Sequence, residues 1–160
     1  QGYRYVLNMD ADFSHDPRYL PDLLAGMEPA GGEEVDVMIG SRYVPGGGVR
    51  NWPPHRKAMS WGVNLYARCL LGLRVRDCSG AYRCYRTSRL GQVDLSQVRS
   101  RGYSFQEEIL WHLKRAGASF GETPIVFSDR ERGTSKINGR EALAAIWIIF
   151  RLGIRNWIGR

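Results

Sequence analysis

The most constraining feature of the sequence is a short hydrophobic segment that runs directly into a group of acidic residues. Residues Tyr3–Met9 are rich in aromatic and aliphatic side chains, a pattern typical of a buried β-strand. Asp10 and Asp12 follow at once, and Asp16-Pro17 then has the pattern that opens a helix, with Asp16 as the N-cap. A buried strand that leads through an acidic loop into a helix is typical of α/β folds. Ligands of such folds bind beyond the carboxyl ends of the strands.

Strand-like and helix-like segments alternate along the rest of the chain. The predicted strands are rich in branched or aromatic residues, and the predicted helices have apolar residues at intervals of three and four. We predict strands at 3–9, 35–39, 81–85 and 120–127, helices at 17–30, 56–71, 105–115 and from about 140 onward, and loops at 43–54 and 128–139. This alternation predicts an α/β fold in which helices flank a largely parallel or mixed sheet.

Composition sets the outer limits. With 160 residues, of which 43% are hydrophobic and 24% charged, the chain is large enough for one domain with a buried core. Three cysteines without a C-x-x-C spacing argue against a disulfide framework or a zinc site and favour a reducing compartment. The longest apolar run, Ala142–Phe150, is too short to span a membrane.

The charges are unevenly placed. The formal net charge of +7 favours anionic partners, such as nucleic acid, an acidic membrane surface or a phosphate-bearing substrate. Residues 1–40 contain eight acidic and two basic residues, whereas residues 41–160 contain eight acidic and 21 basic residues. We therefore expect an acidic region and a basic region with separate tasks.

Asp10 and Asp12 are candidates for a metal site. Carboxylates two residues apart in a turning backbone can face the same opening, where Mg²⁺ or Mn²⁺ would remove their mutual repulsion and bridge to a diphosphate. The alternative is a helix-entry loop that uses its aspartates for turns and capping, and we weigh the two readings about equally from composition alone.

Arg42, Arg56 and Ser60 are candidates for a phosphate site. The two arginines lie at either end of the loop at 43–54, so a folded loop can bring both guanidinium groups to one phosphate monoester, with the Ser60 hydroxyl nearby. The alternative is a pair of solvated surface arginines. The charged loop that starts at Asp129 is a further candidate, since it can either close over an anionic substrate or simply face solvent.

The order of these motifs resembles that of the dolichol-phosphate (polyprenol-phosphate) mannosyltransferases, which belong to glycosyltransferase family 2. Six blocks carry the resemblance, namely Asp10-Ala11-Asp12-Phe13-Ser14-His15-Asp16-Pro17, Gly40-Ser41-Arg42-Tyr43, Arg56-x-x-x-Ser60-x-x-x-Asn64, Asp77-Cys78-Ser79-Gly80-Ala81-Tyr82-Arg83, Gly102-Tyr103-Ser104-Phe105-Gln106-x-Glu108 and Asp129-Arg130-x-x-Gly133-x-Ser135-Lys136. Their order and their spread over most of the chain make the resemblance specific.

The resemblance implies a GT-A type nucleotide-diphospho-sugar transferase fold whose N-terminal nucleotide-binding half is missing from this sequence. Residues 1–139 would then be the C-terminal, acceptor-side portion of the catalytic domain. The implied reaction transfers mannose, with inversion, from GDP-mannose to a polyprenyl phosphate such as dolichyl or undecaprenyl phosphate. An enzyme of this type would work as a peripheral cytoplasmic protein on the cytosolic face of a membrane.

The resemblance also implies roles for the acidic loop. Asp10 and Asp12 would address a Mg²⁺ or Mn²⁺ ion and the donor diphosphate, with Asp12 among the catalytic residues. Some relatives have a glutamine at the position of Ser14 as a further metal ligand. This sequence has a serine in place of that ligand.

The basic residues receive the acceptor in this scheme. The resemblance implies that Arg42, Arg56 and Ser60 hold the lipid phosphate. Arg130 and Lys136 would belong to a loop that closes on the phosphates of the two substrates. Arg42, Arg56 and Arg130 would thereby act as catalytic as well as substrate-binding residues.

A phosphate acceptor changes what the chemistry demands of the protein. A phosphate monoester with a second pKa of about 6 is already largely dianionic at pH 7, so no protein base is required. The problem becomes one of holding two anionic substrates together. Glu107 and Glu108 provide the rival reading, because an acid at such a helix start can be a general base for a hydroxyl acceptor. We favour a structural role for them, as favourable charge at a helix N-terminus.

Residues 140–160 predict an amphipathic helix with basic and aromatic residues. Such a helix can lie in a membrane interface, and the alternative of a helix that packs on the core is about equally favoured. Two other functions stay open. One is a family-2 transferase that uses UDP-glucose or another nucleotide sugar, and the other is a non-catalytic basic fragment that binds anions or nucleic acid. We expect no nucleic-acid partner, because aromatic residues do not alternate with a basic stripe.

Overall fold

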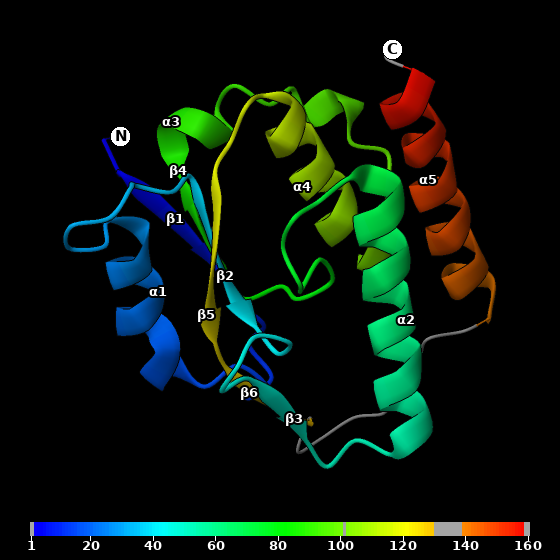
Figure 1. Cartoon of the computed structure of the whole chain (residues 1–160), viewed down its shortest axis with the longest axis horizontal. Coiled ribbons are helices and arrows are strands. Elements are labelled where there is room, and N and C mark those ends of the chain that lie inside the picture. Colours follow the sequence, from blue (N-terminus) through cyan, green and yellow to red (C-terminus); the bar gives the residue numbers. More distant parts are fainter. Residues whose placement is uncertain (1, 101, 130–138, 159–160) are drawn as a thin grey trace.

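A mixed four-stranded sheet forms the centre of the molecule. The computed structural model describes residues 2–100, 102–129 and 139–158. The sheet consists of β1 (Tyr5–Asn8), β4 (Arg83–Arg86), β2 (Val37–Ser41) and β5 (Phe120–Pro124), in the order β1-β4-β2-β5 (Figure 1). Strand β4 runs antiparallel to both β1 and β2, whereas β2 and β5 are parallel. The predicted mixed sheet is confirmed.

The predicted strand at 120–127 is in fact two strands. It divides at Ile125 into β5 and β6 (Val126–Ser128), and β6 pairs in parallel with β3 (Gly48–Arg50), which lies inside the predicted loop at 43–54. The chain turns at Ile125 because its N–H donates to the Ser41 carbonyl and its own carbonyl accepts from Gly48 N–H, at 3.0 and 2.9 Å. The two-stranded ribbon continues from the carboxyl ends of β2 and β5.

Strand β2 extends further than the sequence predicts. We expected it to end at Gly40-Ser41, but both residues remain in the strand and are buried. The Gly40 N–H donates to the Tyr82 carbonyl at 2.9 Å, and a Cβ atom on Gly40 would lie 3.0 Å from the Ile125 side chain. Glycine at this position therefore allows two segments of the chain to approach closely and does not end the strand.

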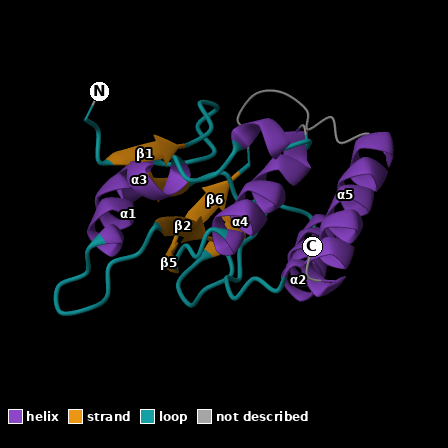
Figure 2. Ribbon diagram, turned by 90° about the horizontal axis from the view of Figure 1, so that it is seen from above, coloured by secondary structure: helices purple, strands orange, loops and turns teal. Residues whose placement is uncertain are grey.

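Helices cover both faces of the sheet. The helices are α1 (Leu20–Met27), which follows a 3-10 turn at Pro17–Tyr19, α2 (Pro54–Leu71), α3 (Thr87–Leu90), α4 (Phe105–Arg115) and α5 (Gly139–Ile158), with further 3-10 turns at Leu95–Gln97 and Gly102–Ser104. Helix α1 lies on one side, while α4, α2 and α5 lie on the other, with α2 and α5 side by side (Figures 1 and 2). Helix α1 ends at Met27, three residues before the predicted end, and α4 has the predicted bounds.

Side chains that alternate along β2 pack into two separate hydrophobic cores. Val37 and Ile39 point to the larger core, which α2, α4 and α5 cover. Met38 points to the smaller core, where it meets Leu23 and Met27 of α1. Two apolar faces explain why β2 is buried at every position.

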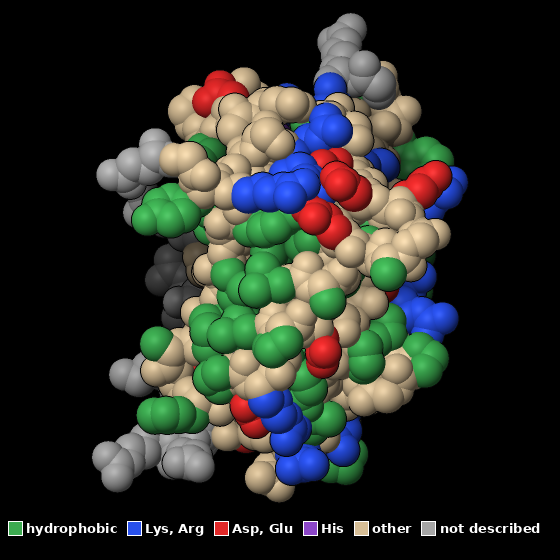
Figure 3. Space-filling model, turned by 90° about the vertical axis from the view of Figure 1, so that its left-hand side faces the viewer, with side chains coloured by type: hydrophobic (Ala, Val, Ile, Leu, Met, Phe, Trp, Pro, Cys, Tyr) green, Lys and Arg blue, Asp and Glu red, His purple; other side chains and the backbone are tan. Residues whose placement is uncertain are grey.

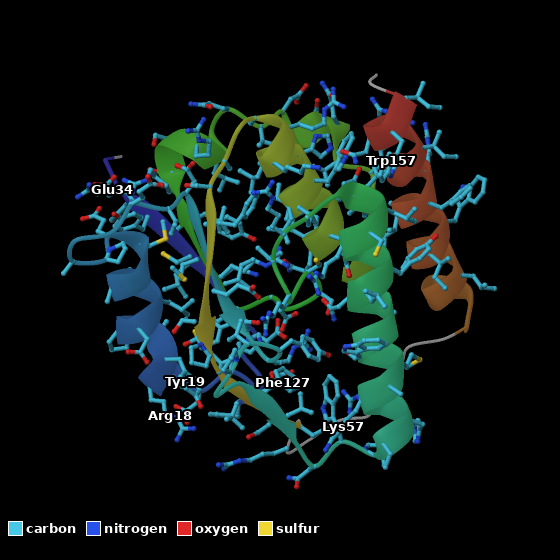
Figure 4. All side chains as sticks on the ribbon, viewed as in Figure 1. Arg18, Tyr19, Glu34, Lys57, Phe127 and Trp157 are labelled. Carbon is cyan, nitrogen blue, oxygen red and sulfur yellow. The ribbon has the colours of Figure 1, made fainter. Side chains whose placement is uncertain are left out.

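Helix α5 is both a core helix and an exposed amphipathic one. Ile149 and Leu152 are buried against the larger core, and a Cβ atom on Gly153 would come within 2.9 Å of the Leu70 side chain. Trp157, labelled in Figure 4, donates from its indole N–H to the Leu70 carbonyl of α2 at 3.2 Å. No helix in the described part of the chain is long and apolar enough to cross a membrane.

Several acidic residues of the first 40 form ion pairs with arginines and lie away from the strand's carboxyl end. Arg4 pairs with Glu28 at 2.7 Å, and Arg86 with Glu34 at 2.9 Å. Basic and acidic side chains lie together on the α1 side of the molecule, above a patch of hydrophobic ones (Figure 3). The acidic residues of this region therefore have two locations: some form ion pairs at the edge of the sheet, and others lie in the loop after β1.

Candidate active site

A cleft of about 440 Å³ lies at the carboxyl ends of β1 and β2. Four of the predicted site residues line it, namely Asp10, Arg42, Arg56 and Ser60. Asp10 comes from the loop after β1, Arg42 from the end of β2, and Arg56 and Ser60 from the first turns of α2. The fold thus brings the predicted acidic and basic groups into one site, as expected for an α/β protein.

His15 fixes the start of the acidic loop, which we define as residues 10–16. Its Nδ1 accepts the Asp10 N–H at 2.9 Å, and its ring stacks on Tyr82 at 4.8 Å and meets Phe127 edge-on at 5.4 Å. Burial lowers the pKa of His15, although the nearby Asp10 carboxylate acts against this. The imidazole is therefore a neutral anchor for the loop, and the Asp10 side chain stays 42% exposed in the cleft.

Asp12 folds the tip of the acidic loop. Its Oδ1 accepts hydrogen bonds from the N–H and the hydroxyl of Ser14, and Phe13 between them has a φ of 64°. This is the turn-forming role that we weighed against metal binding. Asp12 does not line the cleft among the described residues, and no three His, Cys, Asp or Glu side chains described here gather at one point.

Arg42 is anchored by a buried ion pair that the sequence did not predict. Its Nε and Nη2 donate to the two carboxylate oxygens of Asp77, both at 2.7 Å, and its backbone N–H donates to Asp77 at 3.0 Å. The two side chains are 8% and 0% exposed. Burial alone would raise the pKa of Asp77, but the Arg42 guanidinium and the Gly80 N–H hold it below its usual value. Both groups therefore remain charged.

Asn64 ties the Asp77 loop to helix α2. Its amide nitrogen donates to the Ser60 carbonyl and to the Ser79 hydroxyl, at 2.8 and 3.0 Å. Its amide oxygen accepts the N–H groups of Cys78 and Ser79, at 2.7 and 3.2 Å. The Ser79 hydroxyl also accepts from Arg42 at 2.8 Å. We call Arg42, Asp77, Ser79, Asn64 and Ser60 the basic wall.

Arg56 lies beside the basic wall on an aromatic surface. Its guanidinium carbon is 4.2 Å from the centre of the Trp52 ring, and that of Arg42 is 5.7 Å from the same ring. The two arginines therefore meet at one indole, as the predicted folding of the loop at 43–54 requires. Arg56 also pairs with Asp129 at 2.8 Å, and these side chains are 25% and 33% exposed. Phe127, labelled in Figure 4, packs edge-on against Trp52 at 5.6 Å.

One end of the cleft is apolar. It lies between α2 and α5 and is lined by Met59, Val63, Tyr66, Ile146 and Ile149. Ser60 stands on the same helix as Met59 and Val63, and its hydroxyl is hydrogen-bonded to that of Tyr43 at 2.7 Å. A ligand with an anionic head and a hydrocarbon tail matches this change from polar to apolar lining.

Glu107 and Glu108 have different environments. The Glu108 carboxylate is buried and accepts from Ser100 N–H at 2.7 Å, from the Ser100 hydroxyl and from Arg99 N–H at 3.1 Å. Glu107 lines the cleft, and burial raises its pKa to about 7. The favoured interpretation, in which both residues provide favourable charge at a helix N-terminus, is therefore incomplete for Glu107.

Two predicted residues, Arg130 and Lys136, lie outside the described residues. The structure describes the charged loop only as far as Asp129, whose contact with Arg56 joins the start of the loop to the cleft. The sequence assigned no separate role to His15 and gave Glu107 the same role as Glu108, because the contacts that distinguish these residues form only in the fold.

The fold and the cleft define a class of protein, an α/β protein whose cleft at the carboxyl ends of the strands is lined by both acidic and basic side chains. The chain matches the model of glycosyl transferase family 2 over residues 1–93 and belongs to that family. The helices on both faces of a mixed sheet fit a GT-A-like fold. The family that the ordered sequence motifs indicated is confirmed.

Two relatives match the chain over its whole length. It is 44% identical over 160 residues to the polyprenol monophosphomannose synthase of Mycolicibacterium smegmatis and 41% identical over 160 residues to the undecaprenyl-phosphate mannosyltransferase of Micrococcus luteus. The alignments cover 100% and 99% of this chain, but 59% and 64% of the relatives. The chain therefore spans less than two thirds of the length of either relative.

Proposed function

We propose that the full-length protein transfers mannose from GDP-mannose to a polyprenyl phosphate. The single observation that carries this proposal is the cleft in which an exposed carboxylate, two arginines and an apolar end meet. The names of the two relatives support it, since both describe enzymes that join mannose to a polyprenol phosphate. GDP as the nucleotide comes from the family resemblance.

The basic wall and Arg56 would receive the acceptor phosphate. Arg56 is the more accessible of the two arginines, since its side chain is 25% exposed and that of Arg42 is 8% exposed. Arg42 would act from this fixed position, with its guanidinium already oriented before the ligand arrives. Ser60 would add its hydroxyl, and the isoprenoid tail would continue into the apolar end of the cleft.

The acidic loop would face the donor diphosphate. Mg²⁺ is usually held by one or two carboxylates together with substrate phosphates. The residues present fit that mode, because Asp10 is exposed in the cleft and Asp12 follows two residues later in the same loop. A bound ion would supply positive charge that neutralises the departing diphosphate. Ser14 is committed to Asp12, so the protein ligands would be Asp10 and Asp12 alone among the loop's side chains.

In the reaction that we propose, a phosphate oxygen of the acceptor attacks the anomeric carbon of mannose. A new carbon–oxygen bond forms on the side opposite to the leaving group, and the bond to the donor diphosphate breaks with its electron pair, which inverts the configuration. The acceptor dianion needs no deprotonation at pH 7. The arginines lower the repulsion between the two anionic substrates.

The exposed face of α5 would bring the protein to the membrane surface where the acceptor lies. Trp147, Ile154 and Trp157 are 63%, 43% and 74% exposed on this helix, close in sequence to Arg151 and Arg155. Apolar and aromatic side chains next to arginines suit the boundary between headgroups and acyl chains. Flotation with vesicles that contain anionic lipid tests this part, and a Trp147→Ser, Trp157→Ser variant should remain unbound.

The test of the proposed function is an assay of the full-length protein with GDP-mannose, polyprenyl phosphate and Mg²⁺. We expect formation of polyprenyl-phosphate mannose, with UDP-glucose and other nucleotide sugars as poorer donors in the same assay. Arg56→Ala should lower transfer by roughly 100-fold, since a charge-assisted contact to phosphate is lost. The matched control is Lys57→Ala, a neighbouring exposed cation outside the cleft (Figure 4). Equal activity of the two variants would contradict the proposal.

A further inference from the structure

Glu107 has an unusual combination of burial and an open bonding position. Glu107 lies in the first turn of α4, is only 2% exposed and lines the cleft. Among the described residues, its Oε2 has no hydrogen-bond partner. The next residue, Glu108, is equally buried and has its Oε2 satisfied by three donors. Buried carboxylate oxygens in native proteins are rarely left without a donor, so this oxygen can accept a hydrogen bond from a group that enters the cleft.

A second open acceptor lies beside it. Gln106 also lines the cleft, and its side-chain Oε1 has no partner among the residues that the structure describes. The Gln106 backbone carbonyl is separately engaged, since it accepts from Arg83 at 2.8 Å. Two residues that line the cleft, Gln106 and Glu107, thus each have an acceptor oxygen without a donor among the described residues.

The type of ligand group follows from the charges. Phosphate oxygens are acceptors and carry negative charge, so they would repel these two oxygens. Hydroxyl groups are donors and match acceptor oxygens that lack one. In the proposed donor, both the ribose and the transferred sugar carry hydroxyl groups, but only the transferred sugar must lie between the donor diphosphate and the acceptor phosphate, where the acidic loop and the basic wall meet.

We propose that Glu107, with Gln106 beside it, binds hydroxyl groups of the transferred sugar and so determines which sugar is accepted. This inference rests on the proposed function and deepens it. The charged groups that act on Glu107 are Arg83 from β4 and Arg42 and Asp77 from the basic wall, and Asp77 acts in the same direction as burial. Arg83 and Arg42 favour the charged form that accepts hydrogen bonds, against the effect of burial.

The experiment compares full-length wild type with Glu107→Gln and Glu108→Gln on GDP-mannose and on a set of deoxy-mannose donors, each lacking one hydroxyl. In the wild type, kcat/KM should fall by roughly 100-fold for the donor that lacks the hydroxyl bound by Glu107. Glu107→Gln should already be impaired on GDP-mannose and should lose less than about 3-fold more on that deoxy donor. Glu108→Gln, the matched control, should keep the wild-type discrimination whatever its stability.

The outcomes separate the two proposals. If the wild type transfers mannose but Glu107→Gln discriminates among the donors as the wild type does, the role of Glu107 is contradicted and the proposed function stands. If the wild type transfers no mannose, the proposed function fails first. If Glu107→Gln does not fold, Gln106→Ala decides, because its backbone carbonyl keeps the bond to Arg83. Narrowed discrimination in that variant supports the sugar site, and unchanged discrimination overturns it.

Discussion

The acidic loop is held by contacts between near neighbours in the sequence, whereas the basic wall is held by contacts over long separations. Asp12 bonds to Ser14, two residues on, but Arg42 bonds to Asp77 and Ser79 across 35 and 37 residues. The Asp10 side chain is 42% exposed, while that of Asp77 is 0% exposed. The loop therefore depends on local turn geometry, and the wall depends on the completed fold.

This difference has a functional meaning under the proposed reaction. A partly solvated carboxylate can adjust to an incoming ion and diphosphate at small cost. A buried arginine in two bonds to a carboxylate holds its position before the substrate arrives. Substitutions in the basic wall should therefore mainly lower the stability of the protein, and substitutions in the acidic loop should mainly weaken substrate binding.

The largest expected effect comes from removing the buried partner of Arg42. Asp77→Asn leaves the guanidinium without its counter-charge and places an amide nitrogen against its donors. Breaking a buried pair costs about 3–5 kcal/mol, and denaturant unfolding measures this loss. Asp22→Asn, at an exposed position of α1, is the control and should unfold like the wild type. If Asp77→Asn unfolded at the same denaturant concentration as the wild type, the stabilising role of the Arg42–Asp77 pair would be contradicted.

Glu107→Gln should change stability in a way that depends on pH. The pKa of this carboxyl is raised to about 7 in the folded protein, above its ordinary value of 4.5. Its contribution to folding is therefore full below about pH 4.5 and is lost as the pH rises through 7. Between pH 5 and pH 8, the free energy of unfolding of the variant should rise relative to that of the wild type by up to about 3 kcal/mol. Melting curves at both pH values test this, and a constant difference between the two proteins would refute it.

Asn64→Ala should weaken the wall without removing a charge. The amide serves four hydrogen bonds and is 2% exposed, and the N–H groups of Cys78 and Ser79 would lose their acceptor. We expect a loss of about 2 kcal/mol in unfolding free energy. The control is Asn156→Ala, because Asn156 bonds to Leu70 and Lys114 outside the cleft and its replacement should leave acceptor binding unchanged. Asn51→Ala is a poorer control, because Asn51 has a φ of 61°.

Ser14→Ala should have the smallest effect on stability. It removes the hydroxyl bond to Asp12 but keeps the backbone bond, so we expect less than about 1 kcal/mol in thermal unfolding. The same change would remove one hydrogen-bond donor from the Asp12 carboxylate, and the Mg²⁺ concentration for half-maximal transfer should shift by only a few-fold. A loss of stability comparable to that of Asn64→Ala would show that the loop is not locally held.

The features that the sequence predicted well are local ones. The strand that leads into Asp10, the Asp16 cap that accepts from Arg18 N–H at 3.0 Å, and the bounds of α4 depend on residues close in the chain. The split of the last predicted strand at Ile125 depends on Ser41 and Gly48, which are distant in sequence and met only in the fold.

The same limit applies to the site. The convergence of Asp10, Arg42, Arg56 and Ser60 on one cleft was predictable, because each follows a strand end or opens a helix. The Arg42–Asp77 pair was not, since both residues occur in motifs that carry no sign of their pairing. The nucleotide-binding half, the metal ion and the roles of Arg130 and Lys136 remain predictions.

The central claim is that one cleft has two regions, each serving a different substrate. The most direct test is to measure both KM values of the full-length enzyme for two variants, Asp10→Asn and Arg56→Ala. We predict that Asp10→Asn raises the KM for GDP-mannose, or the Mg²⁺ requirement, by roughly 10-fold or more and changes the KM for polyprenyl phosphate by less than about 2-fold, with the reverse for Arg56→Ala. If each variant changed both values equally, or if the pattern were exchanged, the account would be contradicted.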